Sequence, residues 1–581
     1  MPLPHFNWGA LARGAAALIA ASLVASCETT TAATAPAPAR SPASAADVSV
    51  ERVVLQAYRA IGDRHLFQPN FRVIAVETYR GFASSDPALS LVTADQSFTL
   101  RRDGKDILTR QTPADTADGR AWGGMLAELF AASIEASPVL QKIDRNALTK
   151  GAMVATTKQL DKNSRYADPD EAKDNRFQRD GGGGIGITVE RTEDKKVMIR
   201  AVQEDAPAGR AGLQAGDQIV AIDGDSMIDK TLTEVVQKLR GGIGVPVSVT
   251  VSRESQGKEL TFGMRRSRII PTTVLYERRG DIALIRLTGF NSATDDTLHQ
   301  AIEKARNEIG RDLAGIIVDM RSNRGGLLDQ AESVAEEFIG DGVIFSTQGR
   351  HPDSRRTYRS ASRKTVTLPM VVLVNGNSAS AAEIVAAALQ DRGRAVIVGT
   401  TSYGKGTVQT VVRLPNEGEL VLTWSRLLAP SGYTWNELGV LPNICTAKVT
   451  DVDKLGLDSV EANRTTLMRW HAERNPTPDE VSNLRKICPP GEDSPDRDIE
   501  IASRLLRDPT LYAHAVRTGE GDQARLALAA FGRAGLAETR AVYRGERHAA
   551  RRALLQHVEH ARRGNDDADV VRRLRQFAHA A

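Results

Sequence analysis

The sequence predicts an α/β core that carries a smaller, strand-rich insertion and ends in a helical extension. Four apolar runs of buried-strand type, DIALIRL, AGIIVDM, MVVLV and AVIVG, fall between residues 281 and 399. Helical patterns such as TLHQAIEKARNEI and AAEIVAAALQ stand between them. Strands that alternate with helices predict a sheet whose faces are largely covered. With 41% hydrophobic and 25% charged residues, the 581-residue chain has the composition of a globular protein with several domains.

The first 46 residues combine the features of an export signal with those of a tether. Arg13 precedes a short apolar run, and the LVASC that follows, Leu23–Cys27, resembles a bacterial lipobox. We therefore expect a lipoprotein-type signal peptide at 1–27, lipidated on Cys27, and a disordered Thr/Ala/Pro-rich tether at 28–46. The apolar run is about half the ~20 residues of a membrane-spanning helix, so no permanent span is expected. A plain signal peptide with an incidental cysteine is the alternative.

An export signal of this kind predicts a place on the periplasmic side of the bacterial cell envelope, with a lipid anchor at Cys27. Export argues against a nucleic-acid partner, and the net charge of +4 does not indicate one either. Beyond Cys27 only Cys445 and Cys488 remain, and an oxidising compartment makes them candidates for one disulfide. Their surroundings, NIC and KIC, show no metal-ligand spacing such as CxxC, and two free thiols are the alternative.

Three segments outside the strand-rich regions carry no chemistry that the sequence reveals. Residues 47–115 mix a helical pattern with strand-like runs such as FRVIAVETY and predict an α+β segment, and 116–180 predict a helical N-terminal part of the core. Residues 453–581 predict a helical extension, in which Phe531–Ala581 has eleven Arg, no Lys and six acidic residues, a local net charge of +5. We interpret this run as solvated amphipathic helices. A docking surface for an acidic partner or anionic lipid headgroups is the alternative.

Residues 181–266 have short strands and a glycine-rich start, GGGGIGI. Such glycines allow successive backbone N–H groups to point at an anion, and the following strand offers an edge to which an extended peptide can add. The order of turn, short helix and strand in EDAPAGRAGLQAGDQIVAIDGDSM resembles a PDZ domain of the kind found in bacterial proteases. The expected contacts to a substrate C-terminus are Gly184, Ile185, Gly186 and Ile187.

A pair of serines follows the apolar run MVVLV and precedes a helical pattern, in NGNSASAAEI. Chemistry in α/β layers collects where strands end and helices begin, and the helix dipole there favours negative charge. A purely structural interpretation also exists, in which Ser378 or Ser380 caps the helix and Glu383 completes a capping box with Ser380.

Two further strand ends favour the catalytic interpretation. Lys405, in YGKGTVQ, follows the run AVIVG, so parallel packing returns it to the same sheet edge, where burial lowers a lysine pKa and suits it to act as a general base. Gln409 is placed to orient the lysine amine. In VDMRSNRGGLLD, the Gly325–Gly326 amides are expected to form an oxyanion hole together with the amide of Ala381.

These motifs, from about Asn146 to Thr446, resemble those of the carboxyl-terminal processing proteases, also called tail-specific proteases. The matching stretches are LDKNSRY, the PDZ-like stretch, DMRSNRGGLL, NSASAAEI, GKGTVQ and APSGYTWNELGVLPNI. The resemblance implies that Ser380 is the nucleophile, Lys405 its base and Gln409 the support of the lysine. It implies a core at 267–452 related to crotonase and Clp protease, with the PDZ domain inserted. It also implies exported substrates cut at or near apolar C-terminal tails, with no metal or organic cofactor.

Two departures from the family pattern and two rival functions remain. Ala382 replaces a third serine of the usual SASASE, and Pro442-Asn443 stands where the family has PD. A catalytically silent PDZ scaffold is one rival. A Ser–His hydrolase is the other, but His299 and His351, the histidines of the core, both have polar surroundings. Protein substrates are the expected partners, and an adaptor or regulatory protein and a homo-oligomer are left open.

Overall fold

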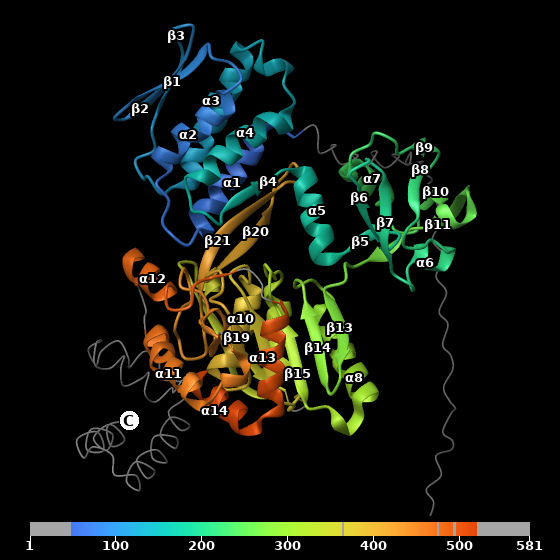
Figure 1. Cartoon of the computed structure of the whole chain (residues 1–581). Helices are drawn as coiled ribbons and strands as arrows, with labels where there is room; N and C mark the ends of the chain where they lie inside the picture. Colours follow the sequence, from blue (N-terminus) through green and yellow to red (C-terminus); the bar gives the residue numbers. More distant parts are fainter. Residues whose placement is uncertain (1–47, 363–364, 450, 473–475, 492–494, 520–581) are drawn as a thin grey trace, which may run out of the picture. The chain divides into compact units, whose positions relative to one another are not determined.

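The computed structural model describes residues 48–362, 365–449, 451–472, 476–491 and 495–519 (Figure 1). The predictions for Cys27, for the tether and for the Arg-rich run 531–581 lie outside these residues. None of the helices in the described ranges is long and apolar enough to span a membrane.

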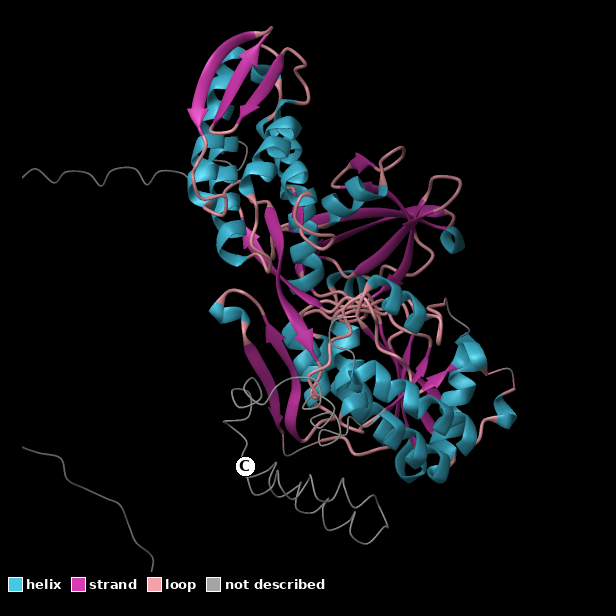
Figure 2. Ribbon diagram, turned by 90° about the vertical axis from the view of Figure 1, so that its left-hand side faces the viewer, coloured by secondary structure: helices cyan, strands magenta, loops and turns pink. Residues whose placement is uncertain are grey.

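The N-terminal segment is a cluster of helices with a three-stranded antiparallel sheet at one end (Figures 1 and 2). Its elements are α1 (Val50–Arg64), α2 (Phe71–Ala83), β1 (Leu89–Ala94), β2 (Ser97–Arg102), β3 (Lys105–Gln111), α3 (Gly119–Ala136) and α4 (Arg145–Lys158). The prediction of a strand at FRVIAVETY is wrong, because this stretch forms α2. Phe71, Ile74, Ala75 and Thr78 are buried at the i, i+3, i+4, i+7 spacing of one helix face, and that spacing outweighs the local alternation.

The strand-rich insertion has its own core and an open edge. After β4 (Arg165–Ala167) and α5 (Pro169–Asp180), its elements are β5 (Gly182–Gly184), β6 (Ile187–Arg191), β7 (Val197–Val202), α6 (Pro207–Ala211), β8 (Gln218–Ile222), β9 (Asp225–Ser226), α7 (Leu232–Leu239), β10 (Pro246–Arg253) and β11 (Lys258–Arg265). The sheet order is β11-β10-β8-β7-β6, so β6 is an edge strand, and α7 packs beside it. The strands and helix expected in this region are confirmed.

The central sheet of the core has the order β13-β14-β15-β18-β19-β22, with every pair parallel except β13–β14. Its strands are β13 (Val274–Arg279), β14 (Ile282–Leu287), β15 (Gly315–Asp319), β18 (Met370–Val374), β19 (Val396–Gly399) and β22 (Ile444–Cys445). The helices are α8 (Thr294–Ile309), α9 (Leu328–Glu336), α10 (Ala381–Asp391), α11 (Leu457–Ala472), α12 (Pro478–Arg485), α13 (Pro495–Arg507) and α14 (Pro509–Gly519). The α/β core predicted from the alternating runs is confirmed.

Both faces of this sheet are covered, by helices from different parts of the chain (Figure 1). Consecutive residues of β18, such as Val371 and Val372, enter two different apolar clusters. The first cluster contains the buried face of α10, and the second contains Ile501 and Leu505 of α13. Because successive side chains of a strand point to opposite faces, a sheet of apolar strands needs a covering layer on each face. The C-terminal extension supplies one of these two layers.

A second, antiparallel sheet links the core to the N-terminal helices. It has the order β17-β16-β21-β20, and β4 pairs with β21. Its strands are β16 (Asp341–Gln348), β17 (Arg356–Ala361), β20 (Thr407–Arg413) and β21 (Glu419–Leu428), whereas β12 (Ser267–Ile269) pairs with β5 in a separate two-stranded sheet. Leu420 and Leu422 of β21 enter the apolar cluster of the N-terminal helices, so this sheet joins the two regions through packed side chains.

Cys445 at the end of β22 and Cys488 after α12 form a disulfide bond across a sequence separation of 43 residues. Replacing both cysteines by alanine should lower the free energy of unfolding by about 4 kcal/mol, because the bond restricts the unfolded chain. Urea unfolding of the double variant and of the wild type, each with and without a dithiol reductant, measures this difference. A difference below ~1 kcal/mol, or a reductant effect in the double variant, would contradict this assignment.

Candidate active site

Ser380 lies where the chain leaves β18 and begins α10, and its backbone conformation is strained. Its φ of 58° and ψ of −114° fall in a region that residues with a side chain rarely adopt. Strain of this kind is costly and persists where the surrounding structure enforces it, which is common at functional sites. The Ser380 side chain is half-buried.

Ser378, two residues earlier, has a different role. Its side chain is fully buried, and its hydroxyl donates to the Met320 carbonyl at 2.8 Å and accepts the Asn375 N–H at 2.9 Å. The Ser378 hydroxyl therefore ties the loop after β18 to the loop after β15. Of the two serines, only Ser380 has a side chain that reaches the surface of the site.

Lys405 lies in the loop between β19 and β20. The Tyr403 N–H donates to the Ser378 carbonyl at 2.9 Å, so this loop is bonded directly to the serine loop. Burial lowers the pKa of Lys405, and the neighbouring Arg165 lowers it further, while Glu383 and Asp161 oppose the shift. A lysine with a depressed pKa is neutral more often and can accept a proton.

Glu383 holds the serine and lysine loops together from the first turn of α10. Its side chain is fully buried. One oxygen, Oε2, accepts the backbone N–H of Ser380 at 2.8 Å and that of Lys405 at 2.9 Å. The other, Oε1, accepts the Ser402 hydroxyl at 2.5 Å and the Gly404 N–H at 2.7 Å. Both candidate catalytic residues are thus fixed to one carboxylate oxygen.

Burial raises the pKa of Glu383, and the four donors oppose this shift by stabilising the carboxylate. The sequence predicts Glu383 only as half of a capping box. That half is present, because the Ser380 N–H donates to it, but the bonds to the lysine loop were missed. The available signal was an acidic residue inside the apolar run AAEIVAAALQ, where an unpaired charge would be costly.

The glycine turn after β15 lies against Ser380. Gly325 has a φ of 92°, and a Cβ added to it would lie 2.8 Å from the Ser380 Cβ. The Gly325 N–H donates to the Asn323 side chain at 2.8 Å, and the Ser380 N–H is used by Glu383. The N–H groups of Gly326 and of Ala381, the first residue of α10, are left as the candidate oxyanion donors.

Gly325→Ala should lower kcat/KM by about a hundredfold for two reasons. The added methyl group would collide with Ser380, and position 325 has a positive φ that alanine rarely adopts. Proteolysis of an unfolded test protein measures the loss, and thermal unfolding checks the fold. Gly257→Ala is the matched control, since Gly257 has a φ of 59° and open space around it. Equal activity of the two variants would contradict the placement of the glycine turn at the site.

Gln409 lies on β20, four residues after Lys405. Its amide nitrogen donates to the hydroxyl of Thr407 at 3.0 Å and to that of Thr423 at 3.5 Å. The amide oxygen of Gln409 is therefore the end left to accept a hydrogen bond.

The C-terminal extension contacts the loops of the site. The Thr401 hydroxyl donates to the Cys488 carbonyl at 2.6 Å, and the Gly376 N–H donates to the Gly491 carbonyl at 3.2 Å. Asp498 of α13 pairs at 3.1 Å with Arg321, which precedes Gly325 by four residues. The C-terminal extension, in which the sequence alone reveals no chemistry, therefore supports the loops that carry the site residues.

The residues expected to bind a substrate C-terminus lie in the inserted domain. Gly184 is the last residue of β5 and pairs with Ser267, while Ile185 is buried. Gly186 has a φ of 83°, and a Cβ there would lie 2.1 Å from the Ala206 Cβ. Ile187 begins β6, the edge strand beside α7. An edge strand can accept an extended peptide as an additional strand.

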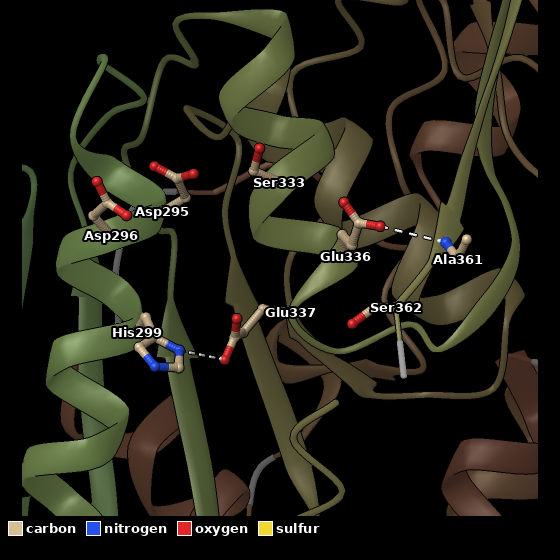
Figure 3. Close-up of a pocket in the computed structure, with 8 residues that line it drawn as sticks. All are labelled: Asp295, Asp296, His299, Ser333, Glu336, Glu337, Ala361 and Ser362. Atoms are coloured by element: carbon tan, nitrogen blue, oxygen red, sulfur yellow. Dashed lines mark hydrogen bonds and ion pairs between the residues drawn. The ribbon is translucent and has the colours of Figure 1, made fainter. Parts of the chain in front are cut away.

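A pocket of about 540 Å³ lies elsewhere on the core, between α8, α9 and β17 (Figure 3). Its lining contains Asp295, Asp296, Glu336 and Glu337 but neither Ser380 nor Lys405. His299 in this pocket bonds to Glu337 at 3.0 Å, and Figure 3 shows Ser333 apart from that pair. Ser333 therefore does not make the contact with His299 that a Ser–His hydrolase would need.

Family models match two parts of the chain: Peptidase family S41 over residues 281–446 and the PDZ domain over residues 198–253. A carboxy-terminal-processing protease of Bartonella bacilliformis is 37% identical over 378 residues, which cover 64% of this chain and 85% of that protein. A probable CtpA-like serine protease of Staphylococcus haemolyticus is 33% identical over 309 residues, 52% of this chain and 61% of that protein. Among solved structures, the photosystem II D1 C-terminal processing protease matches with a TM-score of 0.34 and 23% identity, over 68% of this chain and 93% of that one.

Proposed function

The chain belongs to peptidase family S41 and is a carboxy-terminal-processing protease with a PDZ domain, and on this premise we propose that Ser380 is its nucleophile and Lys405 its general base. One observation carries the proposal: the Oε2 atom of Glu383 accepts hydrogen bonds from the backbone N–H groups of both Ser380 and Lys405. The strained conformation of Ser380 and the lowered pKa of Lys405 support it. A catalytically silent scaffold is not favoured.

The chemistry follows the usual course of acyl transfer. Neutral Lys405 takes the proton of the Ser380 hydroxyl as its oxygen attacks a peptide carbonyl. The N–H groups of Gly326 and Ala381 stabilise the oxyanion, and the lysine ammonium then gives its proton to the leaving amine. Lys405 next activates a water molecule, which hydrolyses the acyl-enzyme. Gln409 accepts a hydrogen bond from the lysine amine through its side-chain oxygen.

The proposed substrates are exported proteins with apolar C-terminal tails. The β6 edge strand and the turn at Ile185–Ile187 support capture of a tail by strand addition. The lipobox-like sequence at Cys27 supports a location on the periplasmic side of the cell envelope, held by a lipid anchor. An adaptor protein and a homo-oligomer are compatible with this function.

Two unfolded reporter proteins that differ only in their last residues test the substrate proposal. The reporter with an apolar tail should be cleaved at least about tenfold faster, by kcat/KM, than the same reporter with an acidic tail. Gly186→Val should abolish this preference for the apolar tail, because a side chain at position 186 would collide with Ala206 and disturb the tail-binding turn. The variant should retain the wild-type kcat. Equal cleavage of both reporters would contradict tail capture and leave the dyad untouched.

The pH dependence follows from Lys405. Only the neutral amine is a base, so kcat/KM should rise as pH increases through the pKa of Lys405. Because burial depresses this pKa, the midpoint of the rise should lie below 10.5, the ordinary value of a lysine. Initial rates measured across the pH range give the midpoint. Lys405→Arg should be inactive at every pH, since a guanidinium stays protonated.

A further inference from the structure

His65, at the end of α1, is a buried histidine of the N-terminal segment whose two ring nitrogens both face acceptors. Its side chain is 3% exposed. Nδ1 lies 2.9 Å from the Phe67 carbonyl oxygen, and Nε2 lies 2.8 Å from Oδ2 of Asp161. A carbonyl oxygen and a carboxylate oxygen can only accept a hydrogen bond, so a ring that carries a proton on each nitrogen would satisfy both contacts. The geometry therefore fits an imidazolium ion paired with a carboxylate.

Asp161, in the loop between α4 and β4, is the centre of a dense set of donors. Besides His65, it accepts the hydroxyls of Ser164 at 2.6 Å and Thr423 at 2.8 Å, and the Asn163 N–H at 2.8 Å. Burial alone would raise the pKa of Asp161, but the hydrogen bonds from these groups outweigh it and lower the pKa. Asp161 is thus held as a carboxylate.

From Asp161 the hydrogen bonds continue to the strand that follows the catalytic lysine. The Thr423 hydroxyl donates to Asp161 and accepts a hydrogen bond from the Gln409 amide. Thr423 and Gln409 lie opposite each other on the paired strands β21 and β20. The Asn163 side chain donates to the Thr407 hydroxyl at 3.2 Å, and Thr407 is the second partner of Gln409. A continuous chain of contacts therefore runs from His65 to Gln409.

We propose that His65 is a positioning residue for the catalytic base: its imidazolium holds the Asp161 carboxylate, which through Thr423 fixes the Gln409 amide on the strand that begins two residues after Lys405. The proposal rests on the proposed function of Ser380 and Lys405. It gives the N-terminal segment an indirect part in the reaction, because His65, on a helix outside the core, acts on the site through Asp161 and Thr423.

The charges around His65 define what its loss would change. Arg350 donates to the backbone carbonyls of His65 and Gly62, and Arg426 lies over the Phe67 ring. The only carboxylate among the described groups that contacts the imidazole ring is that of Asp161, whose charge also opposes the lowering of the Lys405 pKa. Removing the imidazolium leaves the Asp161 charge uncompensated near the lysine.

His65→Gln in the full-length protein tests the proposal, with the exposed His299→Gln as the matched control. We expect kcat to fall about tenfold while KM stays within about twofold, and the pH midpoint of kcat to move upward, since an uncompensated carboxylate favours the lysine ammonium. Asp161→Asn should move the midpoint downward, because it removes that carboxylate. Opposite shifts are a result that a merely structural tie would not produce.

Thr423→Val interrupts the hydrogen bonds between Asp161 and Gln409 without changing His65, and it should reproduce the loss in kcat. This variant therefore tests the proposal even where His65→Gln destabilises the fold. Thermal unfolding of each variant identifies such destabilisation. Unchanged kcat and pH midpoint in folded His65→Gln or Thr423→Val would overturn the proposal. If Ser380→Ala and Lys405→Ala are inactive in the same assay, the dyad stands and only the role of His65 fails.

Discussion

Ser380→Ala and Lys405→Ala should each abolish cleavage of an unfolded test protein, with a loss in kcat of at least about a thousandfold. The first variant removes the attacking oxygen, and the second removes the group that takes its proton. The two changes act on one step, so the double variant should be no less active than either single variant. Initial rates with purified full-length protein measure the effect.

Matched controls separate the dyad from general damage. Lys162→Ala removes an exposed lysine that pairs with Glu437 at 2.7 Å, and Ser333→Ala removes one of the two serines that line the pocket between α8, α9 and β17. Both should retain activity within about twofold of the wild type, because substitutions of side chains at least partly exposed to solvent usually change the stability of a protein very little. Substantial activity in Ser380→Ala or Lys405→Ala would disprove the Ser–Lys dyad.

Glu383→Gln should lower kcat by about a hundredfold and destabilise the protein by ~3 kcal/mol, because its amide group turns a donor toward N–H groups that need an acceptor. The one acceptor oxygen of the amide group can serve at most two of the four donors that bond to Glu383, so the tie between the Ser380 and Lys405 loops is weakened. Steady-state kinetics and urea unfolding measure the two effects.

Glu337→Gln is the control for Glu383→Gln, since Glu337 is partly exposed and pairs with His299 on another part of the core. It should leave kcat unchanged. If Glu383→Gln keeps wild-type kcat while the protein is destabilised as expected, Glu383 supports the fold without positioning the dyad.

The core could be predicted from the sequence because its signals are local. DIALIRL, AGIIVDM, MVVLV and AVIVG have the composition of buried strands, and each forms one. The glycines and serines at the strand ends likewise indicated a site. FRVIAVETY failed as a strand prediction because its alternation spans few residues, whereas the burial of Phe71, Ile74 and Thr78 follows a helix.

The supporting contacts could not be predicted, because they join residues far apart in the chain. His65 and Asp161 are separated by 96 positions, and Arg321 and Asp498 by 177. Asp161 and Arg321 lie in quoted motifs, but their partners His65 and Asp498 lie in none, and only the packing of the N-terminal helices and of α13 on the core brings each pair together. The four-way role of Glu383 was missed for the same reason, since three of its four donors come from the loop after β19.

The most direct test of the dyad is the position at which a serine-directed fluorophosphonate labels the full-length protein, determined by mass spectrometry of its peptides. We predict a single adduct on Ser380, which forms at least about a hundredfold more slowly in Lys405→Ala because the serine then lacks its base. An adduct on Ser378 or Ser333 in place of Ser380, or an equal labelling rate in Lys405→Ala, would contradict the assignment of Ser380 as nucleophile and Lys405 as base.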